Sequence, residues 1–467
     1  MKKLFYFLLF VFPVVGFAQQ SWYKTSQVDS LWKNVGNAGF SAGAVGNTSL
    51  TFNFSDSLPY VAFCDWAGTY GGAATVMKFD GVDWVNVGNE GFSAGGVNYT
   101  SLAFSPSDWM PYVAYSDYAA TISGAVTVMK FNGTNWVNVG NSGFSAGNAN
   151  FVNLAFSPTN NQPYVAYLDW GNSNKATVMR FDGTNWVNVG LPGFSAGSAF
   201  YTSLAFSSID SMPYVAYKDY GNSQKATVMK FNGTTWVNVG NAGFSPGEVN
   251  YTSLAFSSNG KPYVAYQDDA DSSKASVMKF DGNNWDYVGS EGFSRSGTGY
   301  TSLAISPYGE LCLAYQDVAY NDYATMMKFD GTNWVNVGNA GFSAGGIAGT
   351  SLAFSPDGKP YVAYMDDGNS DKATVMKYDS LFVGINEIQK AKFSLYPNPA
   401  TDKITVELKG AILDGNLSIV NIEGQQLITR QITQAKTVID ISNLHSGIYF
   451  VRLTNDKTVE VGKVIKN

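Results

Sequence analysis

Four aromatic side chains recur at one position of this sequence, each directly after an aspartate that ends a short apolar run. Exposed rings on a rigid scaffold can stack on sugars or grip apolar peptide side chains. The same rings could instead cap the junctions between repeated structural units. We take them as candidate ligand-binding residues: Trp66, Tyr118, Trp170 and Tyr220.

The last three copies of this position are not aromatic, and charged side chains gather in that part of the chain. Two carboxylates at a suitable separation could act as the acid and base of a glycosidase, and several could hold calcium. The spacing matches no calcium loop, and acidic side chains on surface loops are usually just solvated. We therefore expect no catalytic residue, no bound metal and no cofactor. The charged residues concerned are Glu248, Asp269, Asp271, Glu291, Arg295, Asp367 and Asp371.

Other chemistry is limited by the residue inventory. His445 is the single histidine, so a histidine-rich zinc site or a Ser-His-Asp triad within the repeats is excluded. We expect Cys64 and Cys312 to be buried free thiols, because they stand in different repeats and a disulfide needs Cα atoms within about 7 Å. A net charge of -7 offers no basic field for nucleic acid or anionic membrane, so neither is an expected partner.

The elements that position these residues are encoded by a repeat that occurs seven times. Each copy reads approximately T-S-L-A-F-S, P-Y-V-A-Y-x-D, K-A-T-V-M-K-F-D-G and W-x-x-V-G. A period near 50 residues, made of short apolar runs separated by turn residues, is typical of β-propellers. The Asp-Gly and Asn-Gly pairs ahead of each tryptophan tolerate the positive φ of tight hairpins. The tryptophans that mark the copies are Trp32, Trp84, Trp136, Trp186, Trp236, Trp285 and Trp334.

The sequence therefore predicts an all-β fold with a seven-bladed β-propeller over residues 32–379. The period resembles that of kelch-like propellers, but the paired glycines of that family are absent, and no close family match is evident. We expect the strand 32–36 to complete the last blade and close the ring, although residues 380–384 are a degraded copy of the same strand and could compete.

The repeated tryptophans, and the phenylalanines of each Gly-Phe-Ser, are expected to pack between blades, and the repeated aspartates to accept hydrogen bonds from turn amides. The connections from second to third strand and from fourth strand to the next blade are long. Both emerge on one face of an up-and-down blade, and we expect that face to carry the ligand.

The N-terminus has the pattern of a secretory signal peptide over residues 1–18, with cleavage between Ala18 and Gln19. No cysteine follows the apolar run, so a lipoprotein anchor is not expected. Residues 19–31 form a short lead-in, and no other segment of the chain suggests a membrane span.

A polar linker is predicted at 380–392, and a different strand pattern begins at Phe393. The stretch Phe393-Ser-Leu-Tyr-Pro-Asn-Pro-Ala-Thr-Asp402 is followed by Ile422-Glu-Gly-Gln-Gln-Leu427, by Leu444-His-Ser-Gly-Ile-Tyr-Phe-Val-Arg-Leu453 and by Lys463-Val-Ile-Lys-Asn467. Residues 393–467 resemble the type A C-terminal sorting domain of type IX secretion cargo. The matching landmarks are Pro397, Asn398, Pro399, Asp402, Gly424, Gly447, Tyr449 and Lys463.

This resemblance implies a small β-sandwich that takes the protein across the outer membrane of a Gram-negative cell and is then removed. The expected partner is the type IX secretion machinery, and the expected location is the cell surface or the medium. For the propeller we expect a binding or adhesion module for glycan or protein. The alternatives are a polysaccharide hydrolase or lyase that uses the acidic residues, and a purely structural surface component.

Overall fold

The computed structural model describes residues 31–67, 71–379, 393–408, 415–421, 426–432, 434–454 and 459–467. The chain forms two compact units, of which one comprises Ser30–Asp379 and the other includes the C-terminal residues. The predicted signal peptide, its cleavage site at Ala18 and Gln19, and the predicted linker 380–392 lie outside the described residues.

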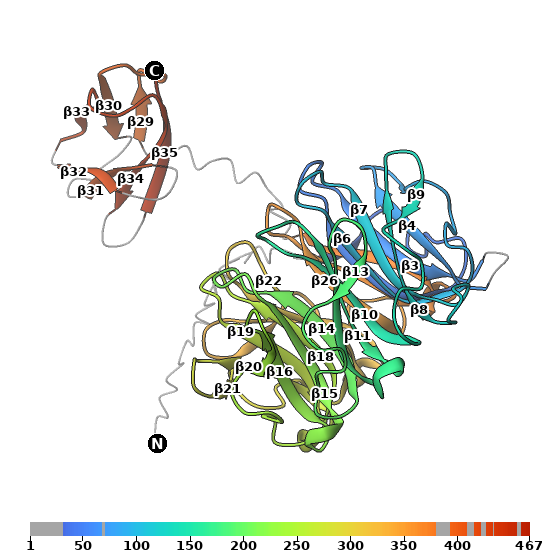
Figure 1. Cartoon of the computed structure of the whole chain (residues 1–467). Coiled ribbons are helices and arrows are strands. Elements are labelled where there is room, and N and C mark those ends of the chain that lie inside the picture. Colours follow the sequence, from blue (N-terminus) through green and yellow to red (C-terminus); the bar gives the residue numbers. More distant parts are fainter. Residues whose placement is uncertain are drawn as a thin grey trace, which may run out of the picture. The chain divides into compact units, whose positions relative to one another are not determined.

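The first unit consists of seven four-stranded antiparallel sheets, which confirms the predicted seven-bladed propeller (Figure 1). The first strands of neighbouring blades contact one another around the centre of the ring. These innermost strands are β2 (Val45–Phe52), β6 (Val97–Phe104), β10 (Ala149–Phe156), β14 (Ala199–Phe206), β18 (Val249–Phe256), β22 (Thr298–Ile305) and β26 (Ile347–Phe354).

The second strands carry the Pro-Tyr-Val-Ala-Tyr-x-Asp segments and are buried on both faces, as expected for a sheet packed between two others. They are β3 (Pro59–Asp65), β7 (Pro111–Asp117), β11 (Pro163–Asp169), β15 (Pro213–Asp219), β19 (Pro262–Asp268), β23 (Leu311–Asp317) and β27 (Pro360–Asp366). The third strands are β4 (Ala73–Phe79), β8 (Ala125–Phe131), β12 (Lys175–Phe181), β16 (Lys225–Phe231), β20 (Lys274–Phe280), β24 (Tyr323–Phe329) and β28 (Lys372–Asp379).

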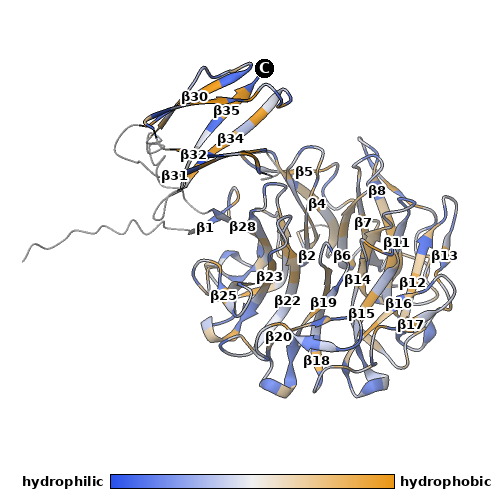
Figure 2. Cartoon of the chain, turned by 90° about the vertical axis from the view of Figure 1, so that its left-hand side faces the viewer, coloured by the Kyte–Doolittle hydropathy of each residue, from blue (hydrophilic) through white to orange (hydrophobic). Residues whose placement is uncertain are grey.

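The fourth strands are short and begin at the repeated tryptophan. They are β5 (Trp84–Asn86), β9 (Trp136–Asn138), β13 (Trp186–Asn188), β17 (Trp236–Asn238), β21 (Trp285–Tyr287) and β25 (Trp334–Asn336). In Figure 2 the strands are coloured more hydrophobic than the loops at their ends, as the repeat predicts.

The N-terminal strand closes the ring. β1 (Leu31–Asn34) pairs antiparallel with β28, with Trp32 opposite Tyr378, and so supplies the fourth strand of blade 7. This confirms that the N-terminal segment completes the last blade. The competing segment 380–384 lies outside the described residues.

Each repeated tryptophan joins two blades, as predicted. The Trp186 indole Nε1 donates a 2.7 Å hydrogen bond to the Val139 carbonyl of the preceding blade, and its ring stacks on Phe144 at 4.3 Å. The other six copies repeat both contacts. The tryptophans are therefore structural.

The repeated aspartates also have the predicted structural role. In blade 3, Asp169 Oδ1 accepts from the Gly171 amide at 3.0 Å, and Oδ2 accepts from Asn172 Nδ2 and Thr177 Oγ1 at 2.7 and 2.9 Å. The aspartate thereby caps a short 3₁₀ turn that connects the second and third strands. Such turns occur in blades 3 to 7 as η1 (Trp170–Asn172), η2 (Tyr220–Asn222), η3 (Asp269–Asp271), η4 (Val318–Tyr320) and η5 (Asp367–Asn369).

The C-terminal unit is a β-sandwich, as predicted. One sheet has the order β29 (Phe393–Tyr396), β30 (Lys403–Leu408), β33 (Lys436–Asp440), and the other has the order β32 (Gln426–Ile432), β31 (Gly415–Val420), β34 (Gly447–Thr454), β35 (Val459–Lys466). One buried cluster contains residues of both sheets, among them Val406 and Val451.

Several residues of the predicted sorting motif fasten this sandwich. The Asn398 amide donates to the Lys463 carbonyl at 2.8 Å and accepts from the Ile465 amide at 2.9 Å, which ties the loop after β29 to the last strand. The buried Tyr449 lies two residues after Gly447, the first residue of β34, and its hydroxyl donates to the carbonyl of His445 just ahead of that strand.

The other motif residues lie in the same region. Pro397 and Pro399 follow cis peptide bonds on either side of Asn398, and the Asp402 carbonyl accepts from the Ile441 amide at 2.8 Å. Gly424 lies outside the described residues.

Both cysteines are free and buried, as predicted. Among the described residues, no helix is long and apolar enough to cross a membrane.

Candidate functional site

The predicted ligand-binding residues lie on one face of the propeller. Each directly follows the last residue of a second strand, in the connection to the third strand. This connection and the one from the fourth strand to the next blade leave an up-and-down blade on the same side, which we call the long-loop face. The side chains of Trp66, Tyr118, Trp170 and Tyr220, here named the outer arc, are 57, 42, 58 and 47 % exposed.

The contacts of the outer arc run inward, towards the innermost strand of the same blade. The Tyr118 hydroxyl accepts from Asn98 Nδ2 at 3.1 Å, and the Tyr220 ring lies 4.9 Å from the Phe200 ring. Asn98 and Phe200 are the second residues of β6 and β14. The arc therefore stands beside the entrance to the central channel.

A second set of aromatic residues, which the sequence analysis did not identify, lines the channel itself. Consecutive ring centroids in this set are 4.8–5.0 Å apart. Together with neighbouring threonines the rings line an open hollow of about 280 Å³. These residues, here named the inner ring, are Tyr99, Phe151, Tyr201, Tyr251 and Tyr300.

The inner ring is incomplete. The equivalent residues of blades 1 and 7 are Asn47 and Gly349, so the aromatic wall has a gap on one side. The recurrence of an aromatic residue just ahead of Thr-Ser-Leu was visible in the sequence. Its functional meaning was not, because an aromatic residue in an apolar strand is normally part of the core.

All seven residues at this position have a left-handed backbone, which is unusual for bulky side chains. Tyr201 has a φ of 52°, and the pairing of β14 with β15 shifts register at the same place. This bulge turns the Tyr201 carbonyl towards the next blade, where it accepts a hydrogen bond from the Thr252 hydroxyl. The hydrogen bond offsets the conformational cost, so the bulge both links blades and presents the aromatic ring to the channel.

One path of rings connects the outer arc to the inner ring. Tyr220 contacts Phe200 at 4.9 Å, Phe200 contacts Phe151 at 5.8 Å, and Phe151 contacts Tyr201 at 4.8 Å. Phe200 is the single aromatic residue at its position, where the other blades have glycine, asparagine or alanine. The aromatic surface is therefore continuous at blade 4.

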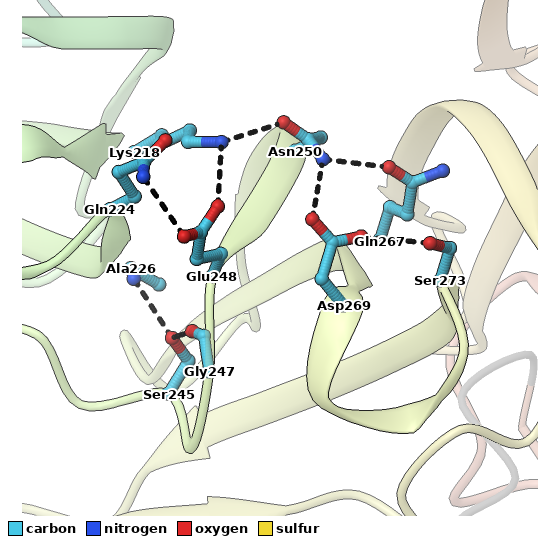
Figure 3. Close-up of polar contacts among 10 residues, drawn as sticks. All are labelled: Lys218, Gln224, Ala226, Ser245, Gly247, Glu248, Asn250, Gln267, Asp269 and Ser273. Atoms are coloured by element: carbon cyan, nitrogen blue, oxygen red, sulfur yellow. Dashed lines mark hydrogen bonds and ion pairs between the residues drawn. The ribbon is translucent and has the colours of Figure 1, made fainter.

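Beside that path lies a polar network between blades 4 and 5 (Figure 3). Lys218 Nζ donates to Asn250 Oδ1 at 3.0 Å and lies 3.9 Å from Glu248 Oε2. The Asn250 amide donates in turn to Gln267 Oε1 at 2.8 Å and to Asp269 Oδ2 at 3.1 Å. We name Lys218, Glu248, Asn250 and Asp269 the polar junction.

The remaining charged residues make contacts outside this network. Asp271 pairs with Lys274 at 3.4 Å, and the Arg295 guanidinium lies 5.8 Å from the centre of the Tyr320 ring. Across the described residues no group of three or more histidine, cysteine or acidic side chains could hold a metal ion.

Two carboxylates of blade 7 are close enough to affect one another. Burial, followed by the interaction with the Asp371 carboxylate, raises the pKa of Asp367 above its ordinary value.

Hollows also occur on the opposite, short-loop face, between neighbouring blades. Equivalent grooves of about 280, 530 and 400 Å³ lie at the junctions of blades 4 and 5, 5 and 6, and 1 and 2. A tyrosine and a lysine from one blade form a wall of each groove, as Tyr214 and Lys230 do. Concave surface is thus present on both faces, whereas the exposed outer arc belongs to the long-loop face.

Comparison with known families identifies the C-terminal unit. Residues 394–467 match the family described as the secretion system C-terminal sorting domain. This protein is type IX secretion cargo. The sorting domain directs it to the cell surface or the extracellular space, as the sequence analysis expected, and implies use of the type IX secretion machinery. No curated protein matches the sequence.

Solved structures support the propeller fold. The BP39L lectin from Burkholderia pseudomallei is 14 % identical with a TM-score of 0.54, and the match covers 73 % of this chain and 97 % of the lectin. The GH74 xyloglucanase from Xanthomonas campestris is 16 % identical with a TM-score of 0.51, covering 81 % of this chain and 59 % of the xyloglucanase. At such low identity these matches concern the fold.

Proposed function

We propose that the propeller is a non-catalytic glycan-binding module that the type IX secretion system delivers to the cell surface or the medium. The observation that carries the proposal is the outer arc, whose four large rings are about half exposed on one face of a rigid ring. Apolar rings held in fixed positions and surrounded by polar loops offer stacking platforms for sugars.

The arrangement of the arc favours a glycan over a protein ligand. Each of the four rings is carried by a different blade, so the platforms are separated from one another around the ring. Protein hot spots cluster in one well-packed and fully desolvated patch. A polysaccharide can instead place a different sugar unit on each platform.

The charged residues support binding rather than hydrolysis or lysis. Glu248 and Asp269 are held within the polar junction, and Asp271 pairs with Lys274, so these carboxylates are already engaged in contacts of the propeller itself. The propeller folds of a lectin and of a xyloglucanase are both similar to this one. The fold alone therefore does not distinguish a sugar-binding protein from a hydrolase.

The proposal is tested by replacing two members of the outer arc, in the variant Trp66→Ala/Trp170→Ala. We expect binding to the best ligand on a glycan array to weaken at least about tenfold, which corresponds to a loss of about 1.4 kcal/mol. The matched control is Trp109→Ala, because Trp109 is 38 % exposed but lies in the β6–β7 connection on the short-loop face. The melting temperature of each variant shows whether the fold is intact.

Three results would contradict the proposal. The first is unchanged glycan binding by the double variant. The second is binding of the wild-type propeller to a protein array with no binding to the glycan array. The third is release of new reducing ends or unsaturated sugars from a bound polysaccharide.

A further inference from the structure

The polar junction between blades 4 and 5 is a break in the sevenfold repeat. At the position of Lys218 the other blades have Cys64, Ser116, Leu168, Gln267, Gln316 and Met365. The Glu248 carbonyl accepts a hydrogen bond from the amide of Asp269, the residue after the repeated aspartate. This bond recurs in every blade, and at the position of Glu248 the other blades have Ala44, Gly96, Asn148, Ser198, Gly297 and Gly346. The combination of a long cation and a carboxylate thus occurs at one junction.

Lys218 is held in place almost without solvent contact, since the residue is 6 % exposed. Its ammonium group donates to Asn250, lies 3.9 Å from Glu248 and is 5.7 Å from the centre of the Tyr220 ring. A buried lysine is costly to retain unless its charge is compensated. Here the compensating groups are fixed at the rim of the long-loop face.

These compensating groups remain accessible. The Glu248 side chain is 49 % exposed, and Gln224 Nε2 donates to its Oε1 at 2.9 Å. Asp269 is exposed on the adjacent turn, where Ser273 donates to its Oδ1 at 2.8 Å. Lys218 and its partners therefore present oriented carboxylate oxygens and amide groups to solvent (Figure 3).

A stacking surface adjoins the polar groups. Tyr220 is 47 % exposed, contacts Phe200, and stands over Lys218. Sugar recognition combines a ring that stacks on the sugar face with fixed polar groups that bind its hydroxyls. At this junction both parts come together.

We infer that the polar junction, together with Tyr220 and Phe200, is the subsite that sets ligand specificity, and that it selects a neutral sugar unit with adjacent free hydroxyls. Glu248 and Asp269 accept hydrogen bonds from the hydroxyls, and the Asn250 and Gln224 amides help to orient these carboxylates. The inference rests on the proposed glycan binding and specifies its ligand.

Charge gives the selectivity for neutral sugars. The junction contains two carboxylates, Glu248 beside Lys218 and Asp269 bound to Asn250, and one lysine, so it carries a net negative charge. A carboxylate or sulfate group on the ligand would be repelled and would lose its hydration without compensation. Uronic acids and sulfated sugars are therefore disfavoured.

The test compares neutral polysaccharides, xyloglucan and starch, with the acidic polysaccharides alginate and polygalacturonate. We expect the full propeller to bind a neutral polymer at least about tenfold more tightly than an acidic one. Glu248→Gln and Tyr220→Ala should each weaken neutral binding at least about fivefold. Glu248→Gln/Asp269→Asn should also reduce the discrimination against the acidic polymers. Glu291→Gln, the same substitution on another loop of this face, should bind like the wild type.

Failure of this inference can be told apart from failure of the proposed function. If Glu248→Gln and Tyr220→Ala bind like the wild type while Trp66→Ala/Trp170→Ala does not, the subsite lies elsewhere and glycan binding stands. A preference of the wild type for alginate or polygalacturonate overturns the assigned ligand class. Absence of binding to every glycan tested overturns both proposals. Unchanged melting temperatures verify that each variant is folded.

Discussion

At the scale of single residues, burial makes the two thiols unreactive. Cys64 Sγ lies 3.1 Å from the Val97 carbonyl and 3.2 Å from the Gly72 carbonyl. Burial raises the pKa of both Cys64 and Cys312 from the ordinary value of 9.0 to about 12. Since the thiolate is the reactive form, both residues have a structural role in the folded protein.

We predict that native protein at pH 8 does not react with iodoacetamide within an hour, whereas protein in denaturant gains two carbamidomethyl groups by mass spectrometry. The raised pKa also predicts a pH dependence of stability. The thiols ionise at a lower pH in the unfolded chain than in the folded protein. Their contribution to the free energy of unfolding is therefore complete below pH 9 and is lost as the pH rises towards 12. Cys64→Ala/Cys312→Ala should remove this part of the alkaline loss, and rapid labelling of the native protein would contradict the prediction.

At the scale of elements, β1 explains how the ring is closed. β1 pairs with β28 along four residues, and Trp32 stacks on Phe342 at 3.9 Å and donates to the Val337 carbonyl at 2.8 Å. Trp32 thus joins blade 7 to blade 6, and Trp84 joins blade 1 to blade 7 in the same way through the Val35 carbonyl and the Phe40 ring. The ring is closed by a segment that comes from the opposite end of the propeller sequence.

We predict that a chain beginning at Val35 melts at least about 5 °C lower than one beginning at Ser30. The shorter chain leaves the edge of β28 unpaired and removes Trp32, and loss of a buried tryptophan side chain alone costs about 3–5 kcal/mol. Calorimetry and limited proteolysis of the two chains measure the effect. Equal melting temperatures would show that another segment can take the place of β1.

At the scale of the whole molecule, the sorting domain and the propeller are separate units. The C-terminal sandwich has its own buried core, and the propeller has cores that each span two neighbouring blades. A chain that ends at Asp379 therefore lacks the sorting domain but keeps every blade.

We predict that this shortened chain folds, as judged by its melting temperature, but remains inside the cell when it is produced in its native host. The full chain should instead appear at the surface or in the medium, with a mass that corresponds to a start at Gln19 and an end within 380–392. Immunoblots of cell fractions and intact-mass measurements test both statements. Export of the shortened chain would contradict the role of the sorting domain.

The fold was largely predictable because it rests on local patterns repeated seven times. Alternating apolar runs, Asp-Gly turns and the tryptophan period indicated the strands, and the unpaired strand at Trp32 indicated how the ring closes. The structural roles of the tryptophans and aspartates were also predictable, since one function for seven copies had to be architectural. The sorting domain was recognised from its motifs in the same way.

The candidate site was predictable in part. The sequence indicated the outer arc through its departure from the repeat, and the structure places those four residues on the long-loop face. The inner ring was missed because Tyr201 and its equivalents look like core residues, and their position in the channel depends on a left-handed bulge, which at Tyr201 is stabilised by a hydrogen bond to the next blade.

The sequence by itself determined the number of blades and the route of export, because each depends on neighbouring residues or on a contiguous motif. The tertiary structure decided which side chains share a site. The polar junction is built from residues far apart in the sequence, Lys218 of blade 4 and Glu248 and Asp269 of blade 5. They share one network because the ring brings these two blades into contact. Chemistry that is assembled across blades depends on through-space distances, which a linear repeat does not specify.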